Sequence, residues 1–197
     1  MTARRSPLAM MVLALLVEAP MHAYRMQQLI RERGKHDVVN VAQRNSIYQA
    51  IERLRREELI RVAETIRAEG RPERTVYALT PAGRRTLDGW LADALATPAR
   101  EFPEFPAALS FLPILPPEEA ARRLDERADT IEARLREREA ALSTIDLPRL
   151  FLVEDEYQAA LLRTELEWVR GLVADLRSGA LTWSDEWLAG WTSATMS

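Results

Sequence analysis

The residues best suited to direct contact with another molecule lie in one polar and basic stretch around position 45. It holds five residue types within six positions: Arg44, Asn45, Ser46, Tyr48 and Gln49. Arginine can bind guanine through two hydrogen bonds, and Asn or Gln can bind adenine in the same way. Ser and Tyr hydroxyls bind phosphate oxygens, and Arg53, further along, would extend such contacts. These residue types therefore favour recognition of DNA.

A second basic group surrounds a turn. Residues 69–73 contain Gly70 and Pro72 and separate two apolar segments that roughly alternate, 59–68 and 75–79. Three arginines lie at or beside this turn: Arg67, Arg71 and Arg74. A hairpin tip with this charge can reach the DNA backbone or the minor groove beside the bases read by the first group. We therefore expect all three arginines to contact DNA.

The distribution of charge along the chain supports this interpretation. The net charge is −3, but residues 1–98 hold 16 of the 27 basic residues and 11 of the 30 acidic ones, so the first half carries +5 and the second −8. Such asymmetry is expected when only one half of a protein meets a polyanion. The alternative, in which the arginines form an ordinary solvated face, is less favoured for a set clustered in the positive half.

The elements that would position these side chains follow from the apolar pattern. The expected helices span residues 7–18, 21–34, 46–57 and 81–96, and the hairpin strands span residues 59–68 and 75–79. The first helix is almost entirely apolar, and Ser6 and Thr80 precede Pro7 and Pro81 as helix caps. Three helices, a hairpin and a helix are the order of a winged helix-turn-helix domain, which we assign to residues 1–97.

The second half is predicted to be a separate helical module. Residues 98–116 are rich in proline and form the connecting segment, with aromatic residues that suggest a docked short helix. Residues 117–145 and 150–177 read as two long helices that Pro148 separates, and Arg138 interrupts the heptad-like stripe of the first. We expect an antiparallel hairpin and assign residues 117–197 to dimerisation. The fold class is thus mainly α with a small β-hairpin wing.

Three aromatic residues could line a pocket for a small-molecule effector. Trp90 belongs to the first module, whereas Phe111 and Trp168 belong to the connecting segment and the second module. Ligand sites favour the junctions between modules, so the sequence allows a cavity there. The alternative, in which these aromatic side chains are simply core residues, is favoured by how often such side chains are buried.

Several classes of function are unfavoured. The chain has no cysteine and two histidines, so disulfides, cysteine-based zinc sites and thiol catalysis are excluded, and no metal or other cofactor is expected. It has no glycine-rich phosphate loop and no nucleophile motif, so we do not expect an enzyme. Arg4, Arg5 and the apolar run 8–17 resemble a secretory signal, but Pro7 and Glu18 favour a helix of the folded domain. With no apolar stretch of membrane-spanning length, we expect a cytoplasmic, nucleoid-associated protein without a membrane partner.

Four linked motifs resemble the PadR family of transcriptional regulators. They lie in order at residues 13–24, 45–54, 70–72 and 77–84, and the resemblance covers about residues 8–95. The helical second half is similar to the subgroup with an extended C-terminal domain. The resemblance implies a homodimer that represses nearby promoters by binding operator DNA, often under control of a small molecule or stress signal. It also places Tyr48 opposite the phosphates and Gly70–Pro72 at the wing.

The chain departs from the family pattern at two positions. The family usually has Gly where this chain has Ala23 and Glu58. A left-handed conformation at Glu58 would cost about 1 kcal/mol, so we expect the turn into the wing to differ here. His22 lies where the family packs its second helix, and we expect a structural histidine rather than a pH sensor.

Two other functions fit part of the pattern. A MarR-like regulator would share the DNA-binding chemistry but not the placement of the four motifs. A winged-helix module for protein–protein interaction would use the acidic helical hairpin and would show no salt-dependent DNA binding. If DNA is the partner, two recognition helices about 34 Å apart are needed to meet successive major grooves, which requires a stable dimer.

Overall fold

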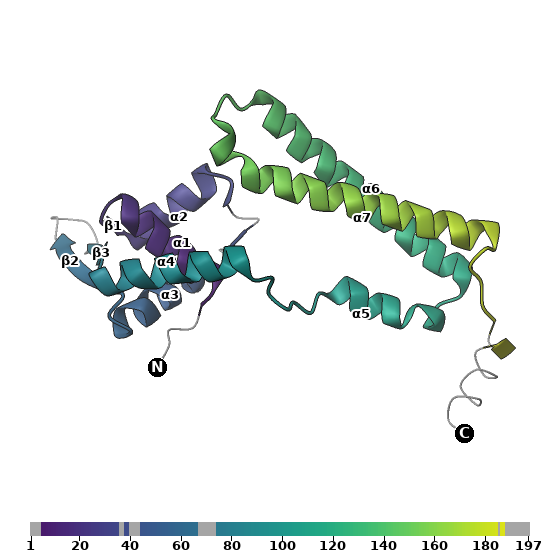
Figure 1. Cartoon of the computed structure of the whole chain (residues 1–197), viewed down its shortest axis with the longest axis horizontal. Coiled ribbons are helices and arrows are strands. Elements are labelled where there is room, and N and C mark those ends of the chain that lie inside the picture. Colours follow the sequence, from purple (N-terminus) through teal and green to yellow (C-terminus); the bar gives the residue numbers. More distant parts are fainter. Residues whose placement is uncertain (1–4, 36–37, 40–43, 67–73, 185, 188–197) are drawn as a thin grey trace, which may run out of the picture. The chain divides into compact units, whose positions relative to one another are not determined.

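The computed structural model describes residues 5–35, 38–39, 44–66, 74–184 and 186–187. The chain divides into two compact units, Met1–Arg100 and Glu101–Ser197 (Figure 1). The predicted fold class is confirmed: most described residues are helical, and the strands form one small antiparallel sheet. Within the described residues, no helix has both the length and the apolar character that crossing a membrane requires.

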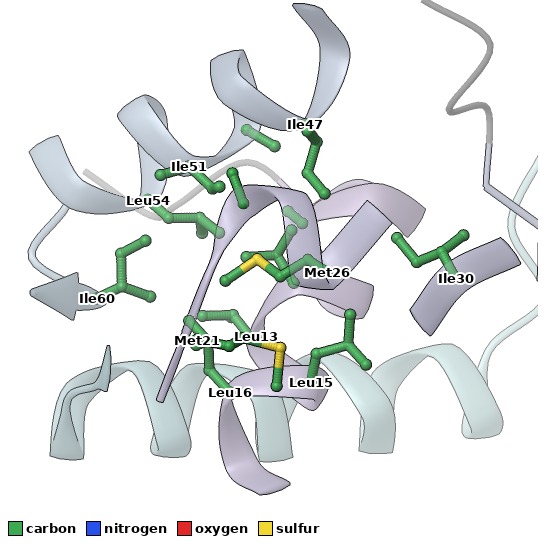
Figure 2. Packing of buried hydrophobic residues seen from close by; sticks show 14 of the residues in the cluster. Leu13, Leu15, Leu16, Met21, Met26, Ile30, Ile47, Ile51, Leu54 and Ile60 are labelled. Carbon is green, nitrogen blue, oxygen red and sulfur yellow. The ribbon is translucent and has the colours of Figure 1, made fainter. Parts of the chain in front are cut away.

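The first unit is built around an apolar helix. Helix α1 (Pro7–Glu18) begins as predicted, with the Ser6 hydroxyl accepting a hydrogen bond from the Ala9 amide at 3.2 Å and Pro7 in the first turn. Around it lie α2 (Ala23–Glu32), α3 (Arg44–Arg56) and α4 (Pro81–Ala96). Figure 2 shows Leu13, Met26 and Leu54 among the buried side chains that meet in this core. Helix α3 is held in this core by its apolar face alone.

The sheet of the first unit has one strand more than predicted. Strands β2 (Ile60–Ile66) and β3 (Arg74–Leu79) form the expected hairpin, and β1 (Met21–His22) pairs with the other side of β3. Met21 lies opposite Tyr77, and Ile60 lies opposite Leu79. The two hairpin strands are therefore held to the start of α2 as well as to the end of α3.

Glu58 adopts the left-handed conformation that its residue type disfavours. Its φ is 57°, so the expectation that the turn into the wing would differ here was wrong. The Leu59 amide donates to the Leu54 carbonyl at 2.9 Å, and the Glu58 amide donates to the Arg55 carbonyl at 3.0 Å. This pair of bonds is the Schellman arrangement, which is usually built around glycine. Burial of Leu54 and Leu59 accompanies it and offsets the backbone cost at Glu58.

The second unit is an antiparallel helical hairpin with a short helix docked on it. Helix α6 (Pro117–Thr144) packs along α7 (Val153–Ser178), as predicted. The helix α5 (Glu104–Ser110) comes before them, and its Phe105 ring meets Trp168 edge to face, with centroids 6.2 Å apart. The Arg127 guanidinium lies 3.5 Å from the centre of the same Phe105 ring. These contacts hold α5 against both long helices.

Ion pairs between α6 and α7 define the register of the hairpin. On one edge, acidic residues of α6 meet arginines of α7 at intervals of seven residues: Asp125–Arg177, Glu132–Arg170 and Glu139–Arg163. On the other edge the signs are reversed, with Arg127 paired to Glu165. Arg138, which interrupts the apolar stripe, reaches Asp155 at 2.6 Å and is mostly shielded from solvent. A shift that is not a multiple of seven residues would leave charges unpaired along both edges, and the pair between Arg138 and Asp155 has no equivalent one heptad away.

Candidate nucleic-acid interface

The two faces of α3 differ sharply. Ile47, Ile51 and Leu54 are at most 1% exposed and anchor the helix in the core. The opposite face carries exposed polar and charged side chains: Tyr48, Gln49, Glu52, Arg55 and Arg56. Half of the surface of Tyr48 is exposed. A helix held by one apolar face and polar on the other can present that polar face to a partner.

The predicted contact residues between positions 44 and 49 of α3 fall into three groups. Tyr48 and Gln49 are exposed, and Ser46 is half-buried in the first turn. Arg44 and Asn45 begin the helix, but their side chains lie outside the described residues. Base-reading side chains are concentrated near the N-terminus of a recognition helix, so the predicted DNA contact would involve the first turns of α3 most.

Arg53 differs from the other predicted contacts because its side chain is engaged within the protein. Its Nη2 donates to the Ser6 hydroxyl at 3.2 Å, and the residue is half-buried. Ser6 is also the cap of α1, so one hydroxyl serves both helices. Arg53 therefore links α3 to the start of α1, a role that the sequence did not suggest.

The predicted contacts of the wing are described only in part. Arg67 and Arg71 lie outside the described residues. Arg74 is exposed at the first position of β3, where it pairs across the sheet with Ile66. Its position at the outer end of the hairpin agrees with a contact beyond the recognition helix.

Sequence reasoning missed a charged pair on α3 that influences the wing strand β3. Arg55 Nη2 donates to Glu52 Oε2 at 3.0 Å on the exposed face of the helix. Burial and, next in size, the negative charge of Glu52 raise the pKa of the Tyr77 phenol on β3 above its usual 10. The positive charge of Arg55 lowers this pKa, and a smaller effect of Tyr48 raises it. The spacing of Tyr48, Glu52 and Arg55 on one helical face was the available signal.

The start of α2 is fixed by a histidine. His22 Nδ1 accepts a hydrogen bond from the Arg25 amide at 3.0 Å and thereby caps the helix. The same residue pairs with Val76 through β1. This is the structural role expected for His22, and it ties α2 to the middle strand of the sheet.

The aromatic residues predicted to line an effector pocket have different surroundings. Trp90 packs against the apolar core of the first unit and also borders an open hollow with Arg5 and Asp93. In the second unit, Trp168 is half-exposed beside Phe105, and Phe111 is 65% exposed. Trp90 thus has a core role, as the alternative predicted, and a ligand site shared by the three stays a prediction. Among the described residues, no group of acidic or histidine side chains is arranged to hold a metal ion.

Comparison with known proteins finds a family match within the first unit. The model of the transcriptional regulator PadR-like family matches residues 12–89. No curated protein matches the chain.

Solved structures similar to this chain cover both units. Bacillus subtilis PadR in complex with operator DNA has a TM-score of 0.68 and 19% identity, over 86% of this chain and 98% of that one. The same protein with p-coumaric acid has a TM-score of 0.68 and 17% identity, over 87% and 99%. The PadR-like regulator BC1756 from Bacillus cereus has a TM-score of 0.60 and 14% identity, over 87% and 99%. At these identities the similarity shows a common fold.

Proposed function

We propose that the protein binds operator DNA as a homodimer and represses transcription, because the model of the PadR-like family of transcriptional regulators matches residues 12–89. Helix α3 enters the major groove and the β2–β3 hairpin contacts the flanking backbone. The family match favours this function over a MarR-like one.

The observation that carries the proposal is the exposed polar face of α3. The major groove is about 12 Å wide and accepts an α-helix, provided that the helix projects from its own domain. Tyr48 and Gln49 lie on the side away from Ile47 and Ile51, so they are available to a groove that receives the helix. The operator complex of Bacillus subtilis PadR, which has the same fold, adds support.

A homodimer is supported by a second apolar stripe on α7. Val153, Tyr157, Leu161 and Trp168 are each 49–62% exposed and share one face of the helix. The face that packs on α6 is nearly opposite and includes Leu166 and Val169. Exposed apolar residues in a continuous stripe mark an interaction surface. A second copy of the chain would bury this stripe and would bring two copies of α3 into one molecule, as binding to successive major grooves requires.

Control by a small aromatic molecule is a further part of the proposal. Bacillus subtilis PadR has been solved with p-coumaric acid, and this chain has a half-exposed Trp168 and an exposed Phe111 in its second unit. Titration of p-coumaric acid against tryptophan fluorescence should give a saturable change, which Trp168→Phe reduces. No saturable change in the wild type would argue against this ligand.

An electrophoretic shift on DNA from upstream of the protein's own gene tests DNA binding. The logarithm of affinity should fall with the logarithm of salt concentration, by about 0.9 for each phosphate contacted. Tyr48→Ala and Arg71→Ala should weaken binding, whereas Arg134→Ala, a change of an exposed arginine on α6, should not. If salt has no effect because no DNA is bound, the protein–protein interaction module becomes the better explanation. If both variants bind as the wild type does, the site assignment is wrong.

A further inference from the structure

Glu52 occupies a position on α3 where an acidic residue is unexpected. Asn45, Gln49, Glu52 and Arg56 follow one another at intervals of four, three and four residues and so form one line along the helix. This line lies opposite the buried face that includes Ile47, and Gln49, Glu52 and Arg56 are all exposed. The line is therefore the part of α3 that would reach deepest into a groove. A carboxylate there must either serve recognition or weaken binding to a polyanion.

The surroundings of Glu52 hold its carboxylate in place and balance its charge. Arg55 donates to Oε2 at 3.0 Å, and the two side chains remain 53% and 50% exposed. The negative charge of Glu52 helps to raise the pKa of the Tyr77 phenol on β3, and the positive charge of Arg55 lowers it. With Arg55 as counter-ion, the pair adds no net charge to the face, so Glu52 can approach the phosphate backbone at a reduced electrostatic cost. Among the described residues, the hydrogen bond to Glu52 is made through Oε2, and Oε1 can accept one from a partner.

The chemistry of an ionised carboxylate restricts what it can recognise. It accepts hydrogen bonds and cannot donate them. In the major groove, guanine presents two acceptors, thymine presents an acceptor and a methyl group, and adenine presents a donor beside an acceptor. Cytosine presents its N4 amino donor, with no acceptor on the same base. The carboxylate therefore finds a favourable partner in cytosine and is repelled by the oxygen atoms of guanine and thymine.

We propose that Glu52 sets the base preference of the protein at one position of each half-site by accepting a hydrogen bond from cytosine N4. The proposal rests on the DNA-binding function and adds a specificity-determining residue to it. Part of the selectivity comes from rejection, because a wrong base places an acceptor against the carboxylate. Tyr48 and the basic residues contribute affinity that does not depend on this base.

Selection from a library of duplexes with a randomised core tests the proposal. The wild type should enrich a motif with cytosine at one position of each half-site. Glu52→Ala should lose the preference at that position alone, with discrimination reduced about tenfold, the scale of one good base contact. Glu52→Gln should favour adenine there, because an amide can bind adenine N6 and N7 together. Glu126→Gln, which removes the same charge from an exposed position on α6, should enrich the wild-type motif.

The outcomes separate this proposal from the function on which it rests. If the wild type enriches no sequence, the DNA-binding function itself fails. If the wild type enriches a motif and both Glu52 variants enrich the same one, the proposal is wrong and the regulator remains. A uniform rise in affinity for all sequences would show that Glu52 only repels DNA, which also overturns the proposal. If Glu52→Ala is poorly folded by circular dichroism, Glu52→Gln, which keeps the shape of the side chain, decides.

Discussion

Gly83 lies where a single added carbon atom should disturb both the end of α3 and the start of α4. A Cβ at this position would lie 2.0 Å from the Leu59 carbonyl oxygen and 2.9 Å from Leu79 Cδ1. The nearest atom is backbone, so no side-chain rotation can relieve the clash. Gly83→Ala must therefore move α4 away from the chain segment that follows α3.

The magnitude follows from the contacts that this movement would stretch. The Thr80 hydroxyl lies 2.8 Å from the Glu58 carbonyl oxygen and 3.0 Å from that of Leu59, and the Thr80 amide donates to Leu59 at 3.1 Å. Overpacking costs about 1–3 kcal/mol and a lost hydrogen bond about 1 kcal/mol. The better helix propensity of alanine returns at most about 1 kcal/mol. We expect a net loss of about 1–4 kcal/mol in the free energy of unfolding of the first unit.

Thermal unfolding followed by circular dichroism measures this loss. A change of 1 kcal/mol shifts Tm by about 4–8 °C in a domain of this size, so Gly83→Ala should lower Tm by about 4–32 °C. Gly89→Ala is the matched control on the same helix, because no atom lies within 4 Å of its added Cβ. The control should raise stability by about 0.5–1 kcal/mol. If both variants melt at the same temperature, the close approach at Gly83 does not constrain the fold.

Three further predictions concern the end of α3, the dimer and the response to acid. Glu58→Gly should raise the free energy of unfolding by about 1 kcal/mol in urea titrations, because glycine adopts a φ of 57° without strain. Leu161→Asp should shift the protein towards monomer in analytical ultracentrifugation, whereas Ala174→Asp, at an exposed position of α7 outside the stripe, should do so less; equal dissociation would point away from the apolar stripe. Hydrogen bonds from Arg33 lower the pKa of Glu18 below 4.5. This exposed pair contributes less than about 1 kcal/mol. The pair stabilises the fold fully above pH 4.5, the unperturbed pKa of a glutamate, and this stabilisation is lost as the pH falls through the lowered pKa of Glu18. The wild type and Glu18→Gln should therefore converge in stability on acidification.

The first unit could be predicted from sequence where local signals suffice. The caps at Ser6 and Thr80 and the buried face of α3 follow from residue type and helical period, and all are confirmed. Strand β1 was missed because two residues cannot show alternation, and its pairing with β3 is a long-range contact. The conformation of Glu58 was predicted wrongly, because backbone cost was weighed without the hydrogen bonds and apolar contact that offset it.

The second unit and the candidate interface show a different limit. The interruption at Arg138 was visible in the sequence, but its partner Asp155 depends on the register between two helices. The exposure of Tyr48 and Gln49 follows from the helical period. The bond from Arg53 to Ser6 could not be predicted, because it joins residues 47 positions apart whose types suggest other roles. Local pattern thus determines which face is exposed, whereas contacts distant in sequence determine which arginine is available.

The direction of α3 is fixed by contacts that do not involve the exposed line of Gln49, Glu52 and Arg56. Arg53 binds Ser6 on one flank, and the Glu58 and Leu59 carbonyl oxygens accept from the Thr80 hydroxyl at the end of the helix. A recognition surface held rigid in this way loses little conformational entropy when DNA binds. Changes to these links should weaken binding to all sequences alike, because they alter the direction of the helix and not what it reads. Ser6→Ala should therefore lower affinity without changing the selected motif. A changed motif in that variant would mean that Arg53, released from Ser6, contacts the bases.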